Sequence, residues 1–146
     1  VKNKKLYLGG TKIPFHSGLQ GHSDGDVILH AIIDAILGAI QKKDIGTYFP
    51  SNKNRFKNIR SPKMLKPILE NLYENNFSIN NLDINLICQK PKVSTYRNRI
   101  INSLSNLMKL DRNKINLKGK TVEKLGLIGK EKAIACEVLI SIKKYD

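Results

Sequence analysis

The chain has 146 residues, a formal net charge of +14 and 40% hydrophobic residues. This length and apolar content are typical of one compact domain with a substantial core, and we find no linker and no internal repeat. No apolar stretch reaches membrane-spanning length without a charge, so we expect no membrane partner.

The first predicted elements are a short strand at residues 6–8, a turn at Gly9-Gly10 and a long helix. In residues 27–40 nearly every position is Val, Ile, Leu or Ala. Such a helix is expected to be buried almost all round.

Polar side chains at the start of this helix form the first candidate site. Asp26, His30 and Asp34 are spaced by four, so they lie along one helix face, and buried polar groups need partners. Gly21 and Gly25 allow the preceding loop to place amides near an anion. The alternative is a core histidine bonded to a carboxylate, with His22 as an ordinary loop residue; we favour the site.

The following elements alternate between helix and strand. Residues 64–73 recur at helical spacing, although Pro67 is expected to kink this helix or shift its start. The others are a strand at 82–88 with one wet face, a helix at 96–108 and strands at 115–117 and 133–142. This order predicts an α/β (α+β) fold, a single-domain sandwich of a mostly mixed β-sheet covered by helices.

Charge and cysteine content narrow the function further. Cys88 and Cys136 lie in predicted strands, so we expect buried, reduced thiols. Lys and Asn are scattered, without aromatic interleaving or a recognisable nucleic-acid motif. The positive charge therefore favours a multiply phosphorylated small ligand over nucleic acid.

Short motifs follow one another along the whole chain. They are Leu8-Gly9-Gly10 with Ile13-Pro14, the segment His22 to His30, Asp44-Ile45-Gly46 with Phe49-Pro50, Pro91-Lys92, the segment Thr121 to Gly126, and Ile134 to Glu137. Their order and spacing resemble the 2-C-methyl-D-erythritol 2,4-cyclodiphosphate synthase family. A single motif would be weak evidence, whereas the ordered set is strong.

The resemblance implies one enzyme domain over residues 1–146, a phosphorus-oxygen lyase of the non-mevalonate isoprenoid pathway. Its reaction converts 4-diphosphocytidyl-2-C-methyl-D-erythritol 2-phosphate to the 2,4-cyclodiphosphate and CMP. Intramolecular phosphoryl transfer depends mainly on alignment and on neutralising phosphate charge. The alternatives are a catalytically silent relative that acts as a nucleotide-binding subunit, and a basic nucleic-acid-binding module.

The resemblance also implies divalent metals. His30 would be one of three zinc ligands, oriented by Asp26 or Asp34, and Glu123 would approach a magnesium or manganese ion on the diphosphate. The family's other zinc ligands, an Asp-x-His pair on an N-terminal strand, are absent from this sequence, and we expect omission rather than loss of the metal. His16 is not expected to replace them.

Further roles are implied for individual residues. His22 and Ser23 would contact the erythritol phosphate end, with His22 and Thr121 stabilising the transition state, and Asp44 would bind hydroxyls unless it is only a turn residue. Cys88 to Ser94 would accept the cytosine base, largely through backbone groups. The remaining expected substrate contacts are Ile45, Gly46, Phe49, Pro50, Cys88, Gln89, Lys90, Pro91, Lys92, Val93, Ser94, Lys120, Val122, Glu123, Leu127 and Lys130. Ser51, Lys120, Val122 and Lys130 depart from the family pattern.

Family membership implies a homotrimer with active sites between neighbouring subunits. The apolar segments 27–40 and 133–142 are suited to burial against a core or a partner. The resemblance implies a location in the bacterial cytoplasm or in a plastid. The Lys- and Asn-rich composition is typical of AT-rich genomes, so we expect either the relict plastid of an AT-rich parasite or the bacterial cytoplasm.

Overall fold

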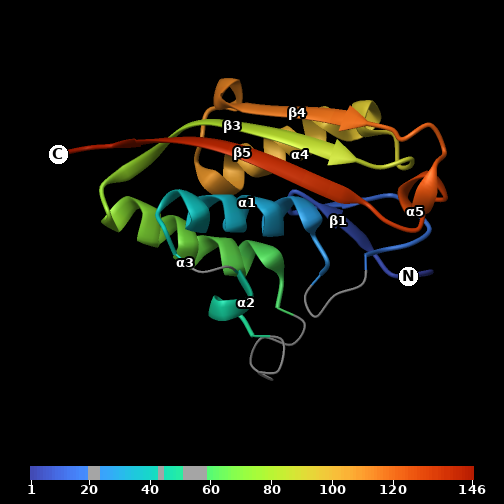
Figure 1. The fold of residues 1–146 in the computed structure, drawn as a ribbon, viewed down its shortest axis with the longest axis horizontal. Coiled ribbons are helices and arrows are strands. Elements are labelled where there is room, and N and C mark those ends of the chain that lie inside the picture. The colour runs from blue at the N-terminus through green and yellow to red at the C-terminus, as the bar shows by residue number, and fades with distance from the viewer. Residues whose placement is uncertain (20–23, 43–44, 51–58) are drawn as a thin grey trace.

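A three-stranded mixed sheet organises the computed structural model, which describes residues 1–19, 24–42, 45–50 and 59–146 (Figure 1). β3 (Phe77–Ile87) is the central strand, paired in parallel with β4 (Ile115–Lys120) and antiparallel with β5 (Ala135–Lys144). The parallel pairing places Ile87 opposite Lys120. The chain therefore leaves β3 and β4 at the same edge of the sheet.

The long helices cover one face of this sheet. α1 (Val27–Ala39), α3 (Ser61–Glu74) and α4 (Val93–Met108) pack on the core. Fully buried side chains of β3 face them, namely Leu82, Ile84 and Leu86. The opposite face carries Glu137 and Leu139, whose side chain is 75% exposed. One side of the sheet is thus a packed core, and the other presents an exposed leucine.

A separate hairpin and several short helices complete the fold. β1 (Leu6–Leu8) and β2 (Thr11–Ile13) pair antiparallel around Gly9 and Gly10, whose φ angles of 66° and 83° suit a turn of glycines. The short helices are α2 (Ile45–Tyr48), η2 (Arg112–Lys114) and α5 (Gly126–Gly129). The sequence pattern predicted β1 and the turn but missed β2 and these helices, because such short elements have too few residues to show a period.

The predicted types of the long elements are confirmed, while their ends differ. β3 begins at Phe77 rather than residue 82, since Phe77 to Ile79 pair with the C-terminal part of β5. Of the two effects expected from Pro67, a kink or a shifted start, the shift is not found, because α3 begins at Ser61 and continues through Pro67. Its buried face outweighs the hydrogen bond that the proline cannot donate; this face comprises Met64, Leu65, Ile68, Leu69 and Leu72.

The expectation that the apolar helix is buried all round is wrong for one face. Ile32, Ile33 and Ile36 are fully buried, but Asp34 and Gly38 are exposed. α1 packs against β5, α3, α2 and β1, and among the described residues Asp34 and Gly38 lie on the side that these neighbours leave exposed. Its polar residues lie along this side.

Both cysteines are free thiols, as predicted. Cys88 is buried and Cys136 half-buried. Burial raises the pKa of Cys88 to about 11 and that of Cys136 to about 12, so both thiols stay protonated at neutral pH. In the described part of the chain, no helix has the length and apolar character needed to cross a membrane.

Candidate active site

The common edge where β3 and β4 end forms a pocket of about 220 Å³. The chain after β3 and the chain after β4 both line it. Among its lining residues are many of the predicted substrate contacts, namely Cys88, Gln89, Pro91, Lys92, Val93, Ser94, Lys120 and Thr121. The fold therefore brings together segments that lie about thirty residues apart in the sequence.

Close backbone approach shapes this pocket. The amide of Cys88 donates to the carbonyl of Lys120 at 3.0 Å, which continues the β3–β4 pairing past Ile87. A Cβ atom built on Gly119 would lie 2.5 Å from Cβ of Val93, the first residue of α4. Glycine is thus required where β4 passes the start of this helix.

The pocket lining is basic. Lys92, Lys120 and Arg97 line it, and its described lining contains no Asp or Glu. Nε of Arg97 donates to the carbonyl of Leu117 at 3.0 Å, and Nη2 donates to Oδ1 of Asn116 at 3.1 Å. These bonds hold the guanidinium beside the pocket, where positive charge favours phosphate groups.

Arg97 was missed in the sequence, although a signal existed. It lies four residues after Val93 and three after Ser94, so helical spacing places all three on the same side of α4. The expected base-binding stretch was treated as a loop, whereas its last residues begin a helix that carries Arg97 to the pocket.

Other predicted substrate contacts lie outside this pocket's lining. Lys90 lines a different cavity of about 140 Å³ together with Glu131 and Lys132. Those that follow β4 are Val122, Glu123, Leu127 and Lys130, of which all but the half-buried Val122 are exposed. The amide of Lys124 donates to Oε1 of Gln89 at 3.0 Å, so this segment is tied to the pocket wall.

The second region of predicted residues is the N-terminal end of α1. Both carboxylate oxygens of Asp26 accept from backbone amides: Leu29 and Gly9 at 3.0 Å and Gly10 at 2.7 Å. Asp26 therefore caps α1 and holds the hairpin turn against it. Burial raises the pKa of Asp26 to about 6, opposed by these amide donors.

Asp24 connects the same helix end to α3. Its carboxylate accepts from the Ser61 amide at 2.9 Å, from the Ser61 hydroxyl at 2.5 Å and from Nε of Arg60 at 3.0 Å. Burial raises the pKa of Asp24, but these hydrogen bonds and one from the Asp26 amide outweigh burial and lower it overall. Asp24 is therefore a buried, ionised carboxylate at neutral pH.

His30 lies beside this buried carboxylate. Its Nε2 atom is 3.0 Å from the hydroxyl oxygen of Ser61, a partner that the sequence analysis did not foresee. Burial lowers the pKa of His30, opposed by the charges of Asp24 and Asp34, so the ring is neutral near pH 7. Neither Asp24 nor Ser61 could be selected from spacing, because α3 contributes Ser61 from a distant part of the chain.

Several predicted site residues fall outside the described residues, namely His22, Ser23 and Asp44, together with Ser51. Ile45 and Gly46 belong to the short helix α2. Phe49 and Pro50 are half-buried, and Phe49 packs against the core. His30 is not among the residues that line the pocket at the ends of β3 and β4.

The described residues do not by themselves form a metal site. They contain no grouping of three or more His, Cys, Asp or Glu side chains that could hold a metal ion. His30 and Glu123, the predicted metal ligands, therefore lack sufficient partners for a complete coordination shell among these residues.

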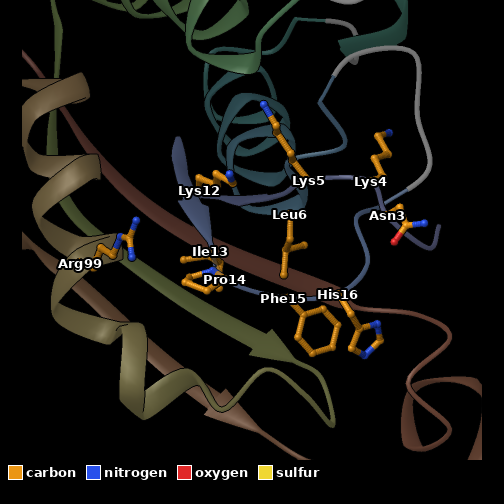
Figure 2. Close-up of a pocket in the computed structure, with 10 residues that line it drawn as sticks. All are labelled: Asn3, Lys4, Lys5, Leu6, Lys12, Ile13, Pro14, Phe15, His16 and Arg99. Atoms are coloured by element: carbon orange, nitrogen blue, oxygen red, sulfur yellow. The ribbon is translucent and has the colours of Figure 1, made fainter.

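A larger cavity of about 560 Å³ lies beside the hairpin, with Arg99 of α4 at one side (Figure 2). Its cations point in different directions in Figure 2, and the ammonium of Lys4 donates to the carbonyl of Leu19. His16 stacks on Phe15 with ring centroids 4.2 Å apart and bonds Ser17. None of the predicted site residues lines this cavity.

Comparison with known proteins identifies the class of the chain. The model of the YgbB family matches residues 1–143, and the chain belongs to this family. The chain is 54% identical, over all its 146 residues, to the bifunctional enzyme IspD/IspF of Pelagibacter ubique, of which it spans 39%.

Shorter relatives are matched over nearly their whole length. The chain is 44% identical over 142 residues to the 2-C-methyl-D-erythritol 2,4-cyclodiphosphate synthase of Caldicellulosiruptor bescii, covering 97% of this chain and 90% of that protein. The Plasmodium falciparum IspF structure, a CDP complex, has a TM-score of 0.87 and 42% identity, covering 100% of this chain and 88% of that one. The family predicted from the motifs, and the mixed α/β fold, are confirmed.

Proposed function

We propose that this chain is a 2-C-methyl-D-erythritol 2,4-cyclodiphosphate synthase. A 2-phosphate oxygen of 4-diphosphocytidyl-2-C-methyl-D-erythritol 2-phosphate forms a bond to the β-phosphorus. The bond from this phosphorus to the bridging oxygen breaks, and CMP leaves with the electron pair. The observation that supports this best is the convergence of predicted substrate residues around one basic pocket, in a chain similar to named synthases and to a CDP complex.

The pocket at the ends of β3 and β4 is the proposed site of the cytidine and its phosphate. Lys92, Lys120 and Arg97 supply positive charge, and Thr121 supplies a hydroxyl beside them. The protein's part in phosphoryl transfer is mainly to align the reacting groups and neutralise phosphate charge, which suits these residues.

The α1 end is the proposed site of the erythritol phosphate part. His30 is the residue there that we propose acts on the substrate, with His22 stabilising the transition state and Ser23 and Asp44 as further contacts. Phe49 and Pro50 follow α2 and would border the same ligand. Five further residues remain predicted substrate contacts in the chain segments that follow β3 and β4. They are Lys90, Val122, Glu123, Leu127 and Lys130.

The proposal for this chain includes the predicted metal ions, with one ligand residue named for each ion. We propose His30 as one zinc ligand and Glu123 as a magnesium or manganese ligand. Since the described residues hold no group of donors sufficient for an ion, the other ligands of each ion would come from outside them.

Pocket size supports the predicted homotrimer with interfacial sites. Pockets for small organic ligands usually enclose about 300–1,000 Å³. At about 220 Å³ the pocket is smaller, so a neighbouring subunit would supply the rest of the surface around the substrate. The exposed Leu139 on the outer sheet face is a suitable contact for such a subunit.

CMP release tests the activity. Full-length protein supplied with substrate, zinc and magnesium is expected to release CMP in proportion to enzyme. CDP binding without CMP release would support the silent relative instead. Binding to any polyanion, lost at moderate salt, would support the nucleic-acid-binding module.

The compartment follows from the source of the chain. Bacterial origin of the Pelagibacter and Caldicellulosiruptor relatives supports the bacterial cytoplasm over the relict plastid. Identification of the source genome decides between the two.

A further inference from the structure

A chain of hydrogen bonds connects the outer sheet face to the guanidinium of Arg97. Oδ1 of Asp83 accepts from Nδ2 of Asn116 at 3.1 Å, and Oδ1 of Asn116 accepts from Nη2 of Arg97 at 3.1 Å. The other oxygen of Asp83 accepts from Nζ of Lys118 at 3.0 Å. The β3–β4 register pairs Asp83 with Asn116, so both side chains leave the sheet on the same face. An acidic residue outside the pocket is thus linked to a cation that lines it.

Arg97 reaches this chain around the free edge of β4. This strand lies at one edge of the three-stranded sheet, and α4 packs on the core side. Nε of Arg97 donates to the carbonyl of Leu117 at 3.0 Å, which fixes one nitrogen of the guanidinium. The bond to Asn116 fixes a second nitrogen, and two anchored nitrogens define the plane of this rigid group. The orientation of the guanidinium therefore depends on Asn116.

The charges on either side of Asn116 determine how its amide is turned. A guanidinium only donates hydrogen bonds, and an ionised carboxylate only accepts them. The hydrogen bond from Lys118 lowers the pKa of Asp83, so this carboxyl is ionised at neutral pH. A reversed amide would turn its nitrogen to Arg97 and its oxygen to Asp83, and both bonds would be lost. Asp83 thus selects the amide orientation that Arg97 needs.

We propose that Asp83 is a positioning residue for the pocket at the ends of β3 and β4: through the amide of Asn116 it holds the guanidinium of Arg97 where its positive charge acts on a phosphate of the bound nucleotide. This inference rests on the proposed function, which places the cytidine and its phosphate in this pocket.

The sign of the effect separates positioning from simple charge. Removing a negative charge near a phosphate site would, by Coulomb's law alone, strengthen the binding of an anion. Removing the acceptor of Asn116 releases one anchor of Arg97 and weakens that binding. At an ionic strength of about 0.15 M the charge effect of a partly exposed residue is screened, so we expect weakening to prevail.

Calorimetry of CDP binding at this ionic strength is the test. Asp83→Ala is expected to lower the affinity about threefold, in the lower part of the range for one hydrogen bond, because Nε of Arg97 keeps its own anchor. Asn116→Ala retains the charge of Asp83 and is expected to give the same loss. It also replaces the first variant if Asp83→Ala does not fold. Unchanged or tighter CDP binding in these folded variants overturns the proposal.

Asp111→Ala is the matched control for the loss of a carboxylate. Asp111 is exposed and precedes η2, and its side chain makes no capping hydrogen bond to this helix. We expect its removal to leave the affinity for CDP unchanged. A threefold loss in this control as well would assign the effect to net charge and overturn the proposal.

A double variant tests whether Asp83 acts through Arg97. If it does, Asp83→Ala combined with Arg97→Ala binds CDP no more weakly than Arg97→Ala alone, because the only group that Asp83 positions is already absent. A further threefold loss in the Arg97→Ala background overturns the proposal. So does a change in oligomeric mass in Asp83→Ala that accompanies the weaker binding and is absent from Asn116→Ala, since the effect would then belong to a subunit contact.

Cytidine, which has no phosphate, distinguishes the charge of Arg97 from the shape of the pocket. We expect the wild type and Asp83→Ala to bind cytidine equally. An equal loss for cytidine and CDP would mean that the whole pocket is displaced, which overturns the proposal. A wild-type protein that binds no CDP contradicts the proposed function and this inference with it, whereas normal CDP binding that Arg97→Ala leaves unchanged overturns this inference alone.

Discussion

The two regions of the proposed active site are built by different means. The pocket at the ends of β3 and β4 is lined by the first turn of α4, the end of β4 and the chain after each strand, and it is shaped by backbone approach at Gly119. The end of α1 is dense, with buried carboxylates of Asp24 and Asp26 that accept hydrogen bonds from several elements.

The difference indicates how each region tolerates change. At the pocket, exchange of the exposed Lys120 side chain leaves no buried polar group without a partner among the described residues, so we expect a small cost there; Val122 lies outside the pocket lining. Where a buried carboxylate has several donors, each side chain is needed, because removing it leaves donors without acceptors. Substitutions at the α1 end should therefore have larger effects than those at the pocket.

The largest effect is expected from His30→Ala. We expect CMP release to fall by about 10³-fold, the scale of losing a group that stabilises charge in the transition state. His16→Ala is the matched control, because the side chain of this exposed histidine contacts only its neighbours Phe15 and Ser17 among its described side-chain contacts. Unchanged turnover in His30→Ala, with His16→Ala as reference, would refute the role of His30.

Asp26→Ala tests how much the hydrogen bonds at the end of α1 contribute to the stability of the protein. The change leaves the amides of Gly9, Gly10 and Leu29 without their acceptor inside the protein. We expect the free energy of unfolding, measured with urea, to fall by roughly 3–5 kcal/mol. A loss below about 1 kcal/mol would mean that water or a neighbour replaces the carboxylate.

The pH dependence of stability tests the effect of burying the Asp26 carboxylate. The folded-state pKa of Asp26, about 6, lies above its ordinary value of 3.8, so the folded protein binds this proton more tightly than the unfolded chain. The stability of the wild type relative to Asp26→Asn is therefore highest below pH 4, and is expected to fall by up to about 3 kcal/mol as the pH rises through 6. A relative stability that rises over this interval would show that the amide donors prevail over burial.

Gly119→Ala tests the pocket through its backbone. The new methyl group would meet Val93 at 2.5 Å, so we expect α4 to shift, with a loss of about 1–3 kcal/mol in stability and weaker binding of CDP by calorimetry. Gly38→Ala is the control, because among the described residues no atom outside its own stretch of helix lies within 4 Å of its Cβ position. Equal CDP affinity in both variants would contradict the packing argument.

Arg97→Ala is expected to have the smallest effect. Arg97 is tied to the Leu117 carbonyl and Asn116, and only its charge is directed to the pocket. We expect CDP affinity to fall about fivefold, equivalent to a single hydrogen bond of about 1 kcal/mol, with folding unchanged. A loss as large as that of His30→Ala would reverse the ranking of the two regions.

Local pattern predicted the long elements, because apolar periodicity is a property of a segment. The alternation around Leu82, Ile84 and Leu86 identified a strand with one buried face. Motif order further predicted residues that the parallel pairing of β3 and β4 does bring together, such as Lys92 and Thr121. Their meeting depends on register, which the sequence pattern alone did not define.

Tertiary partners explain what could not be predicted. The spacing of Asp26, His30 and Asp34 indicated a polar helix face but directed attention to neighbours on the same helix. The Nε2 partner of His30 instead comes from Ser61 on α3, and Asp26 bonds the Gly9 and Gly10 amides of the hairpin. Such contacts join distant segments, so no local period reports them.

The Asp26 carboxylate also has a consequence for the length of the chain between the hairpin and α1. Because it bonds both Gly9 and Gly10, it holds the hairpin turn against the first turn of α1 directly, while residues 14–19 of the connecting segment are held separately by the N-terminal residues. Doubling the length of a flexible loop costs only about 0.6 kcal/mol. An insertion between Leu19 and Asp24, beyond the residues that pair with the N-terminus, should therefore lengthen this connection without displacing the hairpin turn or the first turn of α1.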